Sequence, residues 1–465
     1  MEREYYEQRN KKNLSRKMQL RFMKVLDIVL MTIPFAVCWY SYYTKQVVYS
    51  FYRRGNWMVI TLNAVLYISF ARLYGALDIE TNRISELVFN HILSTVMAGF
   101  FMYIVAWLLA RVAPSVAPLL GAFLAQIFIA VGWSYFAHRW FFKTFGRKKA
   151  CMIYEDESRL EDLQNQKNLG VHYDVVTTLK SEEALSQLSS LDDMETVFVC
   201  GIHSHERNQI VKYCIDHGIE IFDIPRIGDV IMSGAQKMHM YHLPMLQVER
   251  YNPAPEYLFF KRFFDIVLSA IALVILSPLL IVIAIIIKAT DGGTVFYKQT
   301  RLTRDGKEFK LIKFRSMRMD AEKDGVARLS TGESDSRITP IGRFIRKCRI
   351  DELPQLLNIL KGDMSIVGPR PERPEIAKQY EDDLPEFALR LQAKAGLTGY
   401  AQVYGKYNTT PYDKLLMDLM YIAKPSLAED FRICLATVAI LFQKESTEGV
   451  AEGSITAEKK HEDQA

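Results

Sequence analysis

Several features that define common protein classes are missing from this chain. It has six cysteines, at 38, 151, 200, 214, 348 and 434, and no Cys-x-x-Cys pair, which argues against a zinc site or a disulfide framework. We expect these thiols to be buried and reduced. No Asp-x-Asp pair occurs either, which argues against the metal–diphosphate motif usual in metal-dependent glycosyltransferases.

The chain also lacks a glycine-rich turn where a dinucleotide site would need one. Residues 148–230 alternate between strand and helix patterns, which predicts a small Rossmann-like parallel α/β domain over 148–250. Its first strand, 150–154, is followed by Glu155, Asp156 and Glu157, whose charges would repel a pyrophosphate. A structural or regulatory module is favoured over cofactor binding. The other predicted strands are 173–179, 196–201 and 220–224, with helices at 158–167, 181–188 and 206–217, and 231–258 is expected to be a connector.

The net charge of +5 is small, and its placement is more informative than its size. Eight Lys and Arg residues lie within the first 24 positions, directly before an apolar segment. This predicts a basic, cytoplasmic N-terminus at 1–21 rather than a cleaved signal. A nucleic-acid-binding arm is the alternative, but the apolar segments that follow argue against a nucleic-acid partner.

Four long apolar stretches, at 22–43, 57–76, 87–109 and 116–140, predict a transmembrane domain of four helices over 22–142. Each offers roughly 20 residues, enough to cross ~30 Å of hydrocarbon. Asp27, Arg72 and His91 are polar groups in or near these segments. Helix pairing or snorkelling at a helix end is favoured for them over a transport role.

A fifth apolar segment, 266–287, has basic residues at both ends, so both ends favour the same side of a membrane. Ser277 and Pro278 lie at its midpoint, and proline bends a helix because it lacks a backbone N–H. We therefore expect 258–290 to be a re-entrant helix–break–helix hairpin, with Ser277 supplying a hydrogen bond at the bend. A fifth, proline-kinked span is the alternative.

The stretch from Lys298 to Arg373 contains 18 Lys and Arg against 11 Asp and Glu, yet it keeps two adjacent carboxylates, Asp351 and Glu352. Such a pair in basic surroundings suits a phosphorylated ligand and a hard cation such as Mg²⁺. Leucines at 353, 356, 357 and 360 predict a helix. Asp351 as a helix N-cap is therefore an equally good local reading.

Basic residues with phosphate-binding chemistry surround this pair in the sequence. Arg370 stands between Pro369 and Pro371, a guanidinium on a stiff backbone that suits bidentate contacts with phosphate. Lys313, Arg315, Arg337 and Arg343 are further candidates for binding substrate phosphates.

The run of motifs from 258 to 442 resembles the bacterial sugar transferases, which are membrane-bound phosphoglycosyl transferases. The matching residues are Ser277-Pro278, Lys-Phe-Arg-Ser-Met at 313–317, Asp-Glu-Leu-Pro-Gln-Leu-Leu-Asn at 351–358, Lys-Gly-Asp-Met-Ser-Ile-Val-Gly-Pro-Arg-Pro at 361–371 and Gly-Leu-Thr-Gly-Tyr-Ala-Gln-Val at 396–403. The four upstream spans and the Rossmann-like module resemble the long form of that family. By this resemblance 291–442 is the catalytic domain, and the charged segment 443–465 is expected to be a disordered tail.

The resemblance implies transfer of a hexose 1-phosphate from a UDP-sugar to polyprenyl (undecaprenyl) phosphate, with release of UMP, to initiate exopolysaccharide or capsule repeat units. It implies that Asp351 is the nucleophile that forms a phosphosugar–aspartyl intermediate, and that Glu352 helps it to hold Mg²⁺. It also implies a multi-pass protein of the bacterial cytoplasmic membrane with its catalytic domain on the cytoplasmic face. Glucose or galactose is the expected sugar, and a homodimer is a further candidate assembly.

Two other classes compete with this interpretation. A metal-dependent glycosyltransferase would move the sugar without its phosphate and release UDP. A non-catalytic membrane scaffold or regulator of polysaccharide assembly would have no need for an intact acidic pair beside arginines. The product nucleotide separates the first from a phosphoglycosyl transferase, and a carboxylate substitution separates the second.

Overall fold

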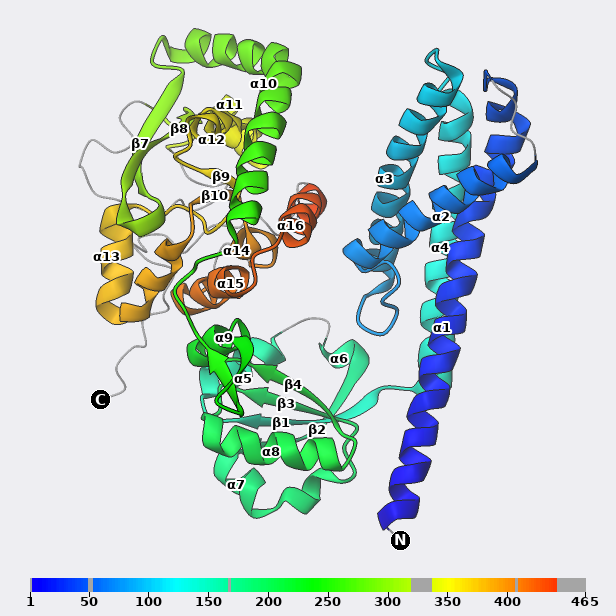
Figure 1. Ribbon diagram of the computed structural model, residues 1–465, viewed down its shortest axis with the longest axis vertical. Coiled ribbons are helices and arrows are strands. Elements are labelled where there is room, and N and C mark those ends of the chain that lie inside the picture. Colours follow the sequence, from blue (N-terminus) through cyan, green and yellow to red (C-terminus); the bar gives the residue numbers. More distant parts are fainter. Residues whose placement is uncertain (1, 49–52, 166–168, 319–336, 406–408, 441–465) are drawn as a thin grey trace. The chain divides into compact units, whose positions relative to one another are not determined.

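The computed structural model describes residues 2–48, 53–165, 169–318, 337–405 and 409–440. The chain divides into two compact units, Met1–Pro225 and Arg226–Ala465. The first unit holds a helical bundle and a parallel sheet (Figure 1), and the second contains Asp351 and Glu352. The predicted tail at 443–465 lies outside the described residues.

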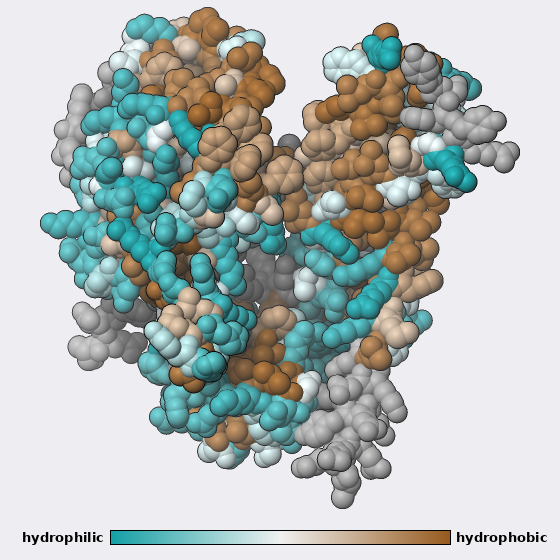
Figure 2. All heavy atoms as spheres, in the orientation of Figure 1, coloured by the Kyte–Doolittle hydropathy of each residue, from teal (hydrophilic) through white to brown (hydrophobic). Residues whose placement is uncertain are grey.

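The bundle consists of four long helices, as the apolar pattern predicts. Each packs against two others, in the order α1–α2–α3–α4 and back to α1. Many of their leucine, valine and phenylalanine side chains stay exposed, and Figure 2 shows this apolar surface. All four are long and apolar enough to cross a membrane. Their bounds are α1 (Glu2–Ser41), α2 (Arg53–Tyr74), α3 (Ile84–Ala110) and α4 (Ala117–Phe145), with a short 3₁₀ helix η1 (Tyr43–Lys45).

Inside the bundle, polar side chains from three helices meet. The Tyr67 hydroxyl on α2 donates to Asp27 Oδ2 on α1 at 3.1 Å and lies 2.8 Å from His91 Nδ1 on α3. All three side chains are buried. Asp27 and His91 therefore pair helices, as the sequence favoured, rather than extend to a helix end.

The α/β part of the first unit is a four-stranded parallel sheet in the order β2-β1-β3-β4. This confirms the predicted parallel α/β fold, and buried residues of β1 and β3 form its core. The strands are β1 (Lys148–Tyr154), β2 (Tyr173–Lys180), β3 (Thr196–Cys200) and β4 (Glu220–Ile224); the helices are α5 (Glu157–Gln164), α6 (Leu169–His172), α7 (Ser181–Ser186), η2 (Leu188–Leu191) and α8 (Ser204–Asp216).

The cysteines and the segment 231–258 differ from what the sequence predicts. Cys348 is exposed and Cys434 is half-buried, whereas the other four thiols are buried as expected; all six are free. The predicted connector 231–258 contains structure of its own: the end of helix α9 (Ile227–Ser233) and an antiparallel hairpin of β5 (Gln236–Met240) and β6 (Leu243–Gln247). Pro244 is tolerated in β6 because a two-stranded hairpin has only edge strands, where a missing N–H costs little.

The second unit begins its apolar part with one long helix, α10 (Pro255–Asp291), which contains Pro278. Figure 1 shows that this helix bends sharply, so that its two arms run in different directions. Pro278 cannot donate to the Val274 carbonyl four residues earlier, and the Ser277 hydroxyl donates to that carbonyl instead, at 2.8 Å. Ser277 thus supplies the hydrogen bond expected of it.

Both arms of α10 pack on the same small fold. Ala272 and Leu273 contact a core that includes Leu311 and Ile359, while Ile283 and Ile287 pack against Phe314 and Ile345. Most of the remaining apolar side chains of α10 are exposed (Figure 2).

The rest of the second unit is a set of short elements built around these contacts. A hairpin of β7 (Phe296–Leu302) and β8 (Glu308–Phe314) turns at Asp305, whose φ of 59° is in the left-handed region. The sequence predicts two short strands here, at 295–299 and 309–314, joined by a polar turn that contains Asp305-Gly306, and the hairpin confirms them. The other elements are η3 (Arg304–Gly306), α11 (Pro340–Lys347), η5 (Ile350–Gln355), α12 (Leu356–Lys361), β9 (Ser365–Val367), α13 (Pro374–Asp383), η6 (Pro385–Gln392), β10 (Gly396–Thr398), α14 (Tyr400–Val403), α15 (Pro411–Ala423) and α16 (Leu427–Ile440).

Candidate active site

Asp351 and Glu352 lie within the 3₁₀ helix η5, directly after Arg349, whose φ of 52° is in the left-handed region. The predicted helix therefore begins later than the leucine spacing indicated, because α12 starts only at Leu356. Asp351 is not an N-cap: the residue at that position is Arg349, and it makes no side-chain capping bond. The capping interpretation of Asp351 is therefore wrong, and neither carboxylate of the pair is used to cap the helix.

Glu352 is held by two cations that the sequence had singled out. Its Oε1 accepts from Lys313 Nζ at 3.3 Å and from Arg370 Nη2 at 3.1 Å. Lys313 comes from β8 and Arg370 from the loop between β9 and α13. Burial would raise the pKa of Glu352, but Arg370, Lys313 and Arg349 outweigh burial and hold that pKa well below its usual range. Glu352 is therefore a fixed anion.

Asp351 has a different environment although it is the next residue in the chain. Burial, and then the negative charge of Glu352, raise its pKa to about 6, although Lys313, Arg346 and Arg370 act in the opposite direction. Among the described residues no hydrogen bond or ion pair reaches its carboxylate. Asp351 is thus a carboxylate that titrates near neutral pH and is not committed to a protein partner.

The motif that contains the pair also contains the residue that fixes its position. The buried amide of Asn358 on α12 accepts from the Ile312 N–H at 3.0 Å and donates to the Lys310 carbonyl at 2.8 Å. It therefore binds α12 to β8 as a neighbouring strand would. Arg262 of α10 donates to the carbonyls of Ile359 and Leu360, which satisfies the C-terminal end of α12.

The three residues of the Pro-Arg-Pro motif are held through their main chain. The Pro369 carbonyl accepts from the Gly396 N–H at 2.9 Å, and the Pro371 carbonyl accepts from Arg301 Nη1 at 3.2 Å. Arg370 itself is half exposed and extends to Glu352. The structure therefore brings Asp351, Glu352, Lys313 and the Pro-Arg-Pro loop together.

Three other predicted phosphate ligands are placed differently. Arg315 is buried, and its guanidinium lies against Gly293 at the end of α10. Arg337 pairs through its carbonyl with the Arg318 N–H, and Arg343 is exposed on α11. No contact described here links these three side chains to Glu352, and their phosphate-binding role stays a prediction.

Sequence reasoning did not single out several cations that act on the acidic pair. Arg349 adds to the effect of Arg370 and Lys313 in lowering the pKa of Glu352, and Arg346 opposes the rise in the pKa of Asp351. Arg301 lines a small cleft with Lys313, Glu352 and Arg370. Arg346 and Arg349 belong to the basic run just before the pair, so proximity in sequence was the available signal. Arg301 lies about fifty residues upstream, and only the fold shows its place.

The donor chemistry of the pair suits a hard cation. Asp351 and Glu352 are adjacent carboxylates, and among described side chains the hydrogen bonds to them go to Glu352 Oε1 alone. No group of three or more His, Cys, Asp or Glu side chains with metal-site geometry occurs in the described residues. Two carboxylates alone fit Mg²⁺, which binds proteins through one or two carboxylates and takes its other ligands from water and phosphate.

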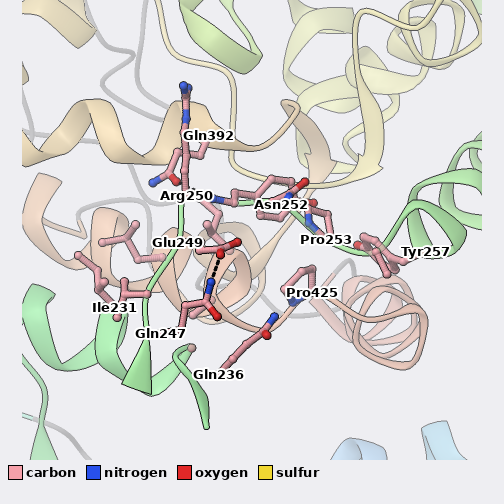
Figure 3. Close-up of a pocket in the computed structure, with 17 residues that line it drawn as sticks. Ile231, Gln236, Gln247, Glu249, Arg250, Asn252, Pro253, Tyr257, Gln392 and Pro425 are labelled. Atoms are coloured by element: carbon pink, nitrogen blue, oxygen red, sulfur yellow. Dashed lines mark hydrogen bonds between the residues drawn. The ribbon is translucent and has the colours of Figure 1, made fainter. Parts of the chain in front are cut away.

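A second hollow in this unit, of about 300 Å³, lies beside the base of the β5–β6 hairpin (Figure 3). Its walls include Tyr257 of α10 and Gln392 at the end of η6, and Gln247 donates to Glu249 across one side. None of the predicted site residues lines it. The larger hollow and the acidic pair are therefore separate features.

Comparison with known proteins identifies a family for the second unit. A family model described as bacterial sugar transferase matches residues 256–444. The chain is 35% identical over 236 residues to a UDP-N-acetylgalactosamine-undecaprenyl-phosphate N-acetylgalactosaminephosphotransferase of Aeromonas hydrophila, covering 50% of this chain and 55% of that protein. It is 38% identical over 212 residues to the UDP-glucose:undecaprenyl-phosphate glucose-1-phosphate transferase of Escherichia coli K12, covering 44% of each.

A third relative is covered almost completely. The chain is 41% identical over 187 residues to the exopolysaccharide production protein PSS of Rhizobium leguminosarum bv. phaseoli, which is 38% of this chain and 92% of that protein. By contrast, the alignments span only about half the length of the Aeromonas and Escherichia proteins.

Proposed function

Because the chain belongs to the bacterial sugar transferase family, we propose that it is a phosphoglycosyl transferase that moves a hexose 1-phosphate from a UDP-sugar to polyprenyl phosphate and releases UMP. The relatives' names supply the substrate class. The observation that carries the proposal is the asymmetric acidic pair: Glu352 is fixed by Lys313 and Arg370, while Asp351 is left unbonded among the described residues.

The chemistry follows from that asymmetry. The Asp351 carboxylate attacks the phosphorus that bears the sugar, the bond from that phosphorus to the bridging oxygen breaks, and UMP leaves. The phosphate of the lipid then attacks the same phosphorus, which regenerates the Asp351 carboxylate. Covalent catalysis divides one exchange into two steps, and each step replaces one high-energy phosphate bond with another.

Lys313 and Arg370 neutralise charge on the donor's phosphates, since phosphoryl transfer depends on positioning and charge compensation. Asp351 and Glu352 would together hold Mg²⁺, which would supply further neutralisation of the diphosphate when bound. The negative charge of Glu352 holds the side chains of Lys313 and Arg370 close together, because both donate to its Oε1.

The apolar helices make this a membrane protein, and we propose that α10 enters one leaflet and returns rather than crosses. Support comes from the bend, from the Ser277 bond to Val274, and from the packing of both arms on one small fold. The site would then lie at the cytoplasmic face, where the head group of a lipid phosphate is found. A homodimer stays a prediction.

The test is the identity of the product. Purified protein in polyprenyl-phosphate-containing detergent should release UMP, not UDP, from at least one of a panel of UDP-sugars. The Aeromonas and Escherichia relatives are named for N-acetylgalactosamine and glucose, so the panel must include both of these and galactose, the other sugar expected from the sequence. Asp351→Asn should abolish release while the protein stays folded and in the membrane fraction. Release of UDP would support a glycosyltransferase, and full activity of Asp351→Asn would remove the proposed nucleophile.

A further inference from the structure

The loop that carries Arg370 is fixed by an unusual run of contacts. Four successive carbonyls, those of residues 369 to 372, each accept a hydrogen bond, and the donors come from three elements of the second unit: β7, η6 and β10. Two come from main-chain N–H groups, those of Gly396 and Leu302, at 2.9 and 3.0 Å. The other two come from arginine side chains, Arg301 and Arg390. Nothing in the sequence pattern gives a role to Arg390.

Arg390 is the arginine that holds Arg370 itself. Its Nη2 donates to the Arg370 carbonyl at 2.8 Å. The same guanidinium converges on one oxygen of Asp418 on α15: Nε donates to Oδ2 at 2.8 Å, and Nη2 lies 2.7 Å from the same atom. Arg390 is only 3% exposed and Asp418 only 1% exposed. A planar guanidinium fixed in this way has little freedom to move.

A buried ion pair is weak evidence for stability, because the cost of removing two charges from water can exceed their attraction. In this position the Arg390–Asp418 pair matters because it fixes the position of other groups. The contacts run without a gap from Asp418 to Arg390, to the Arg370 carbonyl, and through the Arg370 side chain to Glu352 at 3.1 Å. Glu372 extends the cluster, with its carboxylate 3.7 Å from Arg390 and 3.8 Å from Arg301.

We propose that Arg390, locked by Asp418, is a positioning residue for Arg370: it fixes the main chain of Arg370 so that the guanidinium reaches the acidic pair and the donor's phosphates. This inference rests on the proposed function. Arg390 touches neither substrate nor the acidic pair in this role and acts entirely through Arg370. Its contribution should therefore disappear when the Arg370 side chain is removed.

That dependence gives a sharp test by double-mutant cycle. Arg390→Lys keeps a charge but cannot hold both Asp418 and the Arg370 carbonyl with the same fork, and Asp418→Asn removes the charge that locks it. We expect each to lower kcat/KM for UMP release by at least tenfold in the wild-type background. In an Arg370→Ala background, assayed at raised enzyme concentration, each should lower it by less than twofold.

A matched control is available in the exposed pair Arg250–Asp305, 2.6 Å apart in the same unit. Arg250→Lys should change kcat/KM by less than twofold in both backgrounds. Equal losses for Arg390→Lys and Asp418→Asn with and without Arg370 would overturn the positioning role and leave a structural one. Failure of both variants to fold, judged by thermal unfolding and gel filtration, would overturn it as well.

The outcome for the wild-type protein keeps this inference separate from the proposed function. If wild type releases UDP in place of UMP, the proposed function is wrong, and the cycle can still be measured on the UDP product. If wild type releases UMP and the cycle is additive, the function stands and the role of Arg390 is wrong.

Discussion

Asp351 and Glu352 are neighbours in sequence but occupy opposite electrostatic environments. Glu352 lies between Lys313 and Arg370 and keeps its charge. Asp351 lies beside that negative charge, and no cation in the described part of the chain is bonded to it. A fixed negative charge next to a carboxylate raises the pKa of that carboxylate, because two like charges repel. The charge on Glu352 has this effect on Asp351. The pair therefore has two roles: one residue organises the cations and the other reacts.

This division predicts a pH dependence. The attacking form of Asp351 is the carboxylate, and its pKa is raised to about 6, so protonation removes the nucleophile as pH falls through that value. At a fixed Mg²⁺ concentration we expect kcat/KM to be level above about pH 7 and to fall about tenfold from there to pH 5. An ordinary aspartate would give a flat profile over this range. Circular dichroism at each pH is the control for unfolding, and a flat profile down to pH 5 would contradict the assignment.

Tyr67 allows a second prediction at the scale of one residue. Its hydroxyl joins Asp27 and His91 across three helices of the bundle. Tyr67→Phe keeps the ring and removes both contacts, so we expect a loss of about 0.6 kcal/mol in bundle stability and at most about 1.7 kcal/mol, the average and the maximum for hydrogen bonds between membrane helices. Unfolding in mixed micelles measures this loss. Tyr40→Phe, at an exposed position on α1, is the control and should be neutral; equal stabilities for both variants would show that the triad contributes nothing.

At the scale of helices and strands, the sequence predicted the elements best where a single hydrophobic pattern ran through the segment. The four bundle helices, strands β1 to β4 and the β7–β8 hairpin follow from apolar length, period and a turn at Asp305-Gly306. The leucine period at 353–360 gave a helix that starts too early. The 3₁₀ geometry of η5 follows from the left-handed backbone at Arg349 and from Pro354, which leucine spacing does not report.

The sequence also identified only some of the residues of the candidate active site. Asp351, Glu352, Lys313 and Arg370 could be found because motifs mark them. Arg301 and Arg390 could not, because their partners are distant in the chain: Arg390 lies 28 residues from Asp418, and no periodic pattern connects positions on η6 and α15. The β5–β6 hairpin was missed for a local reason, since the proline at 244 argued against a strand that the edge position tolerates.

Helix α10 gives a prediction about topology. If the bend turns the helix back within one leaflet, its two ends face the same compartment. Lys261 is a poor labelling position because it is paired with Asp430 at 2.9 Å and largely buried. Single cysteines at the exposed positions Glu256 and Thr290, in a Cys348→Ser background, should both react with an impermeant maleimide from the cytoplasmic side only.

The matched variant for that experiment restores the missing donor. Pro278→Ala returns a backbone N–H that can reach the Val274 carbonyl, and Ser277→Ala removes the hydroxyl that now occupies it. In the double variant the straight helix is favoured, and the label at residue 290 should lose its cytoplasmic accessibility in part of the population. Opposite compartments in the parent protein would establish a fifth crossing.

At the scale of the whole molecule, the residues proposed for the reaction and the helical bundle belong to different compact units. The family match at 256–444 lies inside the second unit, and so does every residue proposed for the reaction. The first unit contributes a bundle with the length for membrane crossing and a sheet whose first strand is followed by three acids rather than a phosphate-binding turn. The bundle and α10 are therefore each long and apolar enough to attach the chain to a membrane.

This redundancy predicts that the second unit works alone. A fragment of residues 226–465 keeps α10, whose exposed leucine, isoleucine and phenylalanine side chains require lipid, and it keeps the whole acidic site. The Rhizobium relative is little longer than the 187 residues of its alignment with this chain, which cover 92% of it, and it is therefore shorter than the fragment. We expect the fragment to sediment with membranes and to release UMP with kcat/KM within tenfold of the full chain. Asp351→Asn in the fragment is the control for background hydrolysis. A folded, membrane-bound fragment without activity would show instead that the bundle or the sheet contributes directly to catalysis.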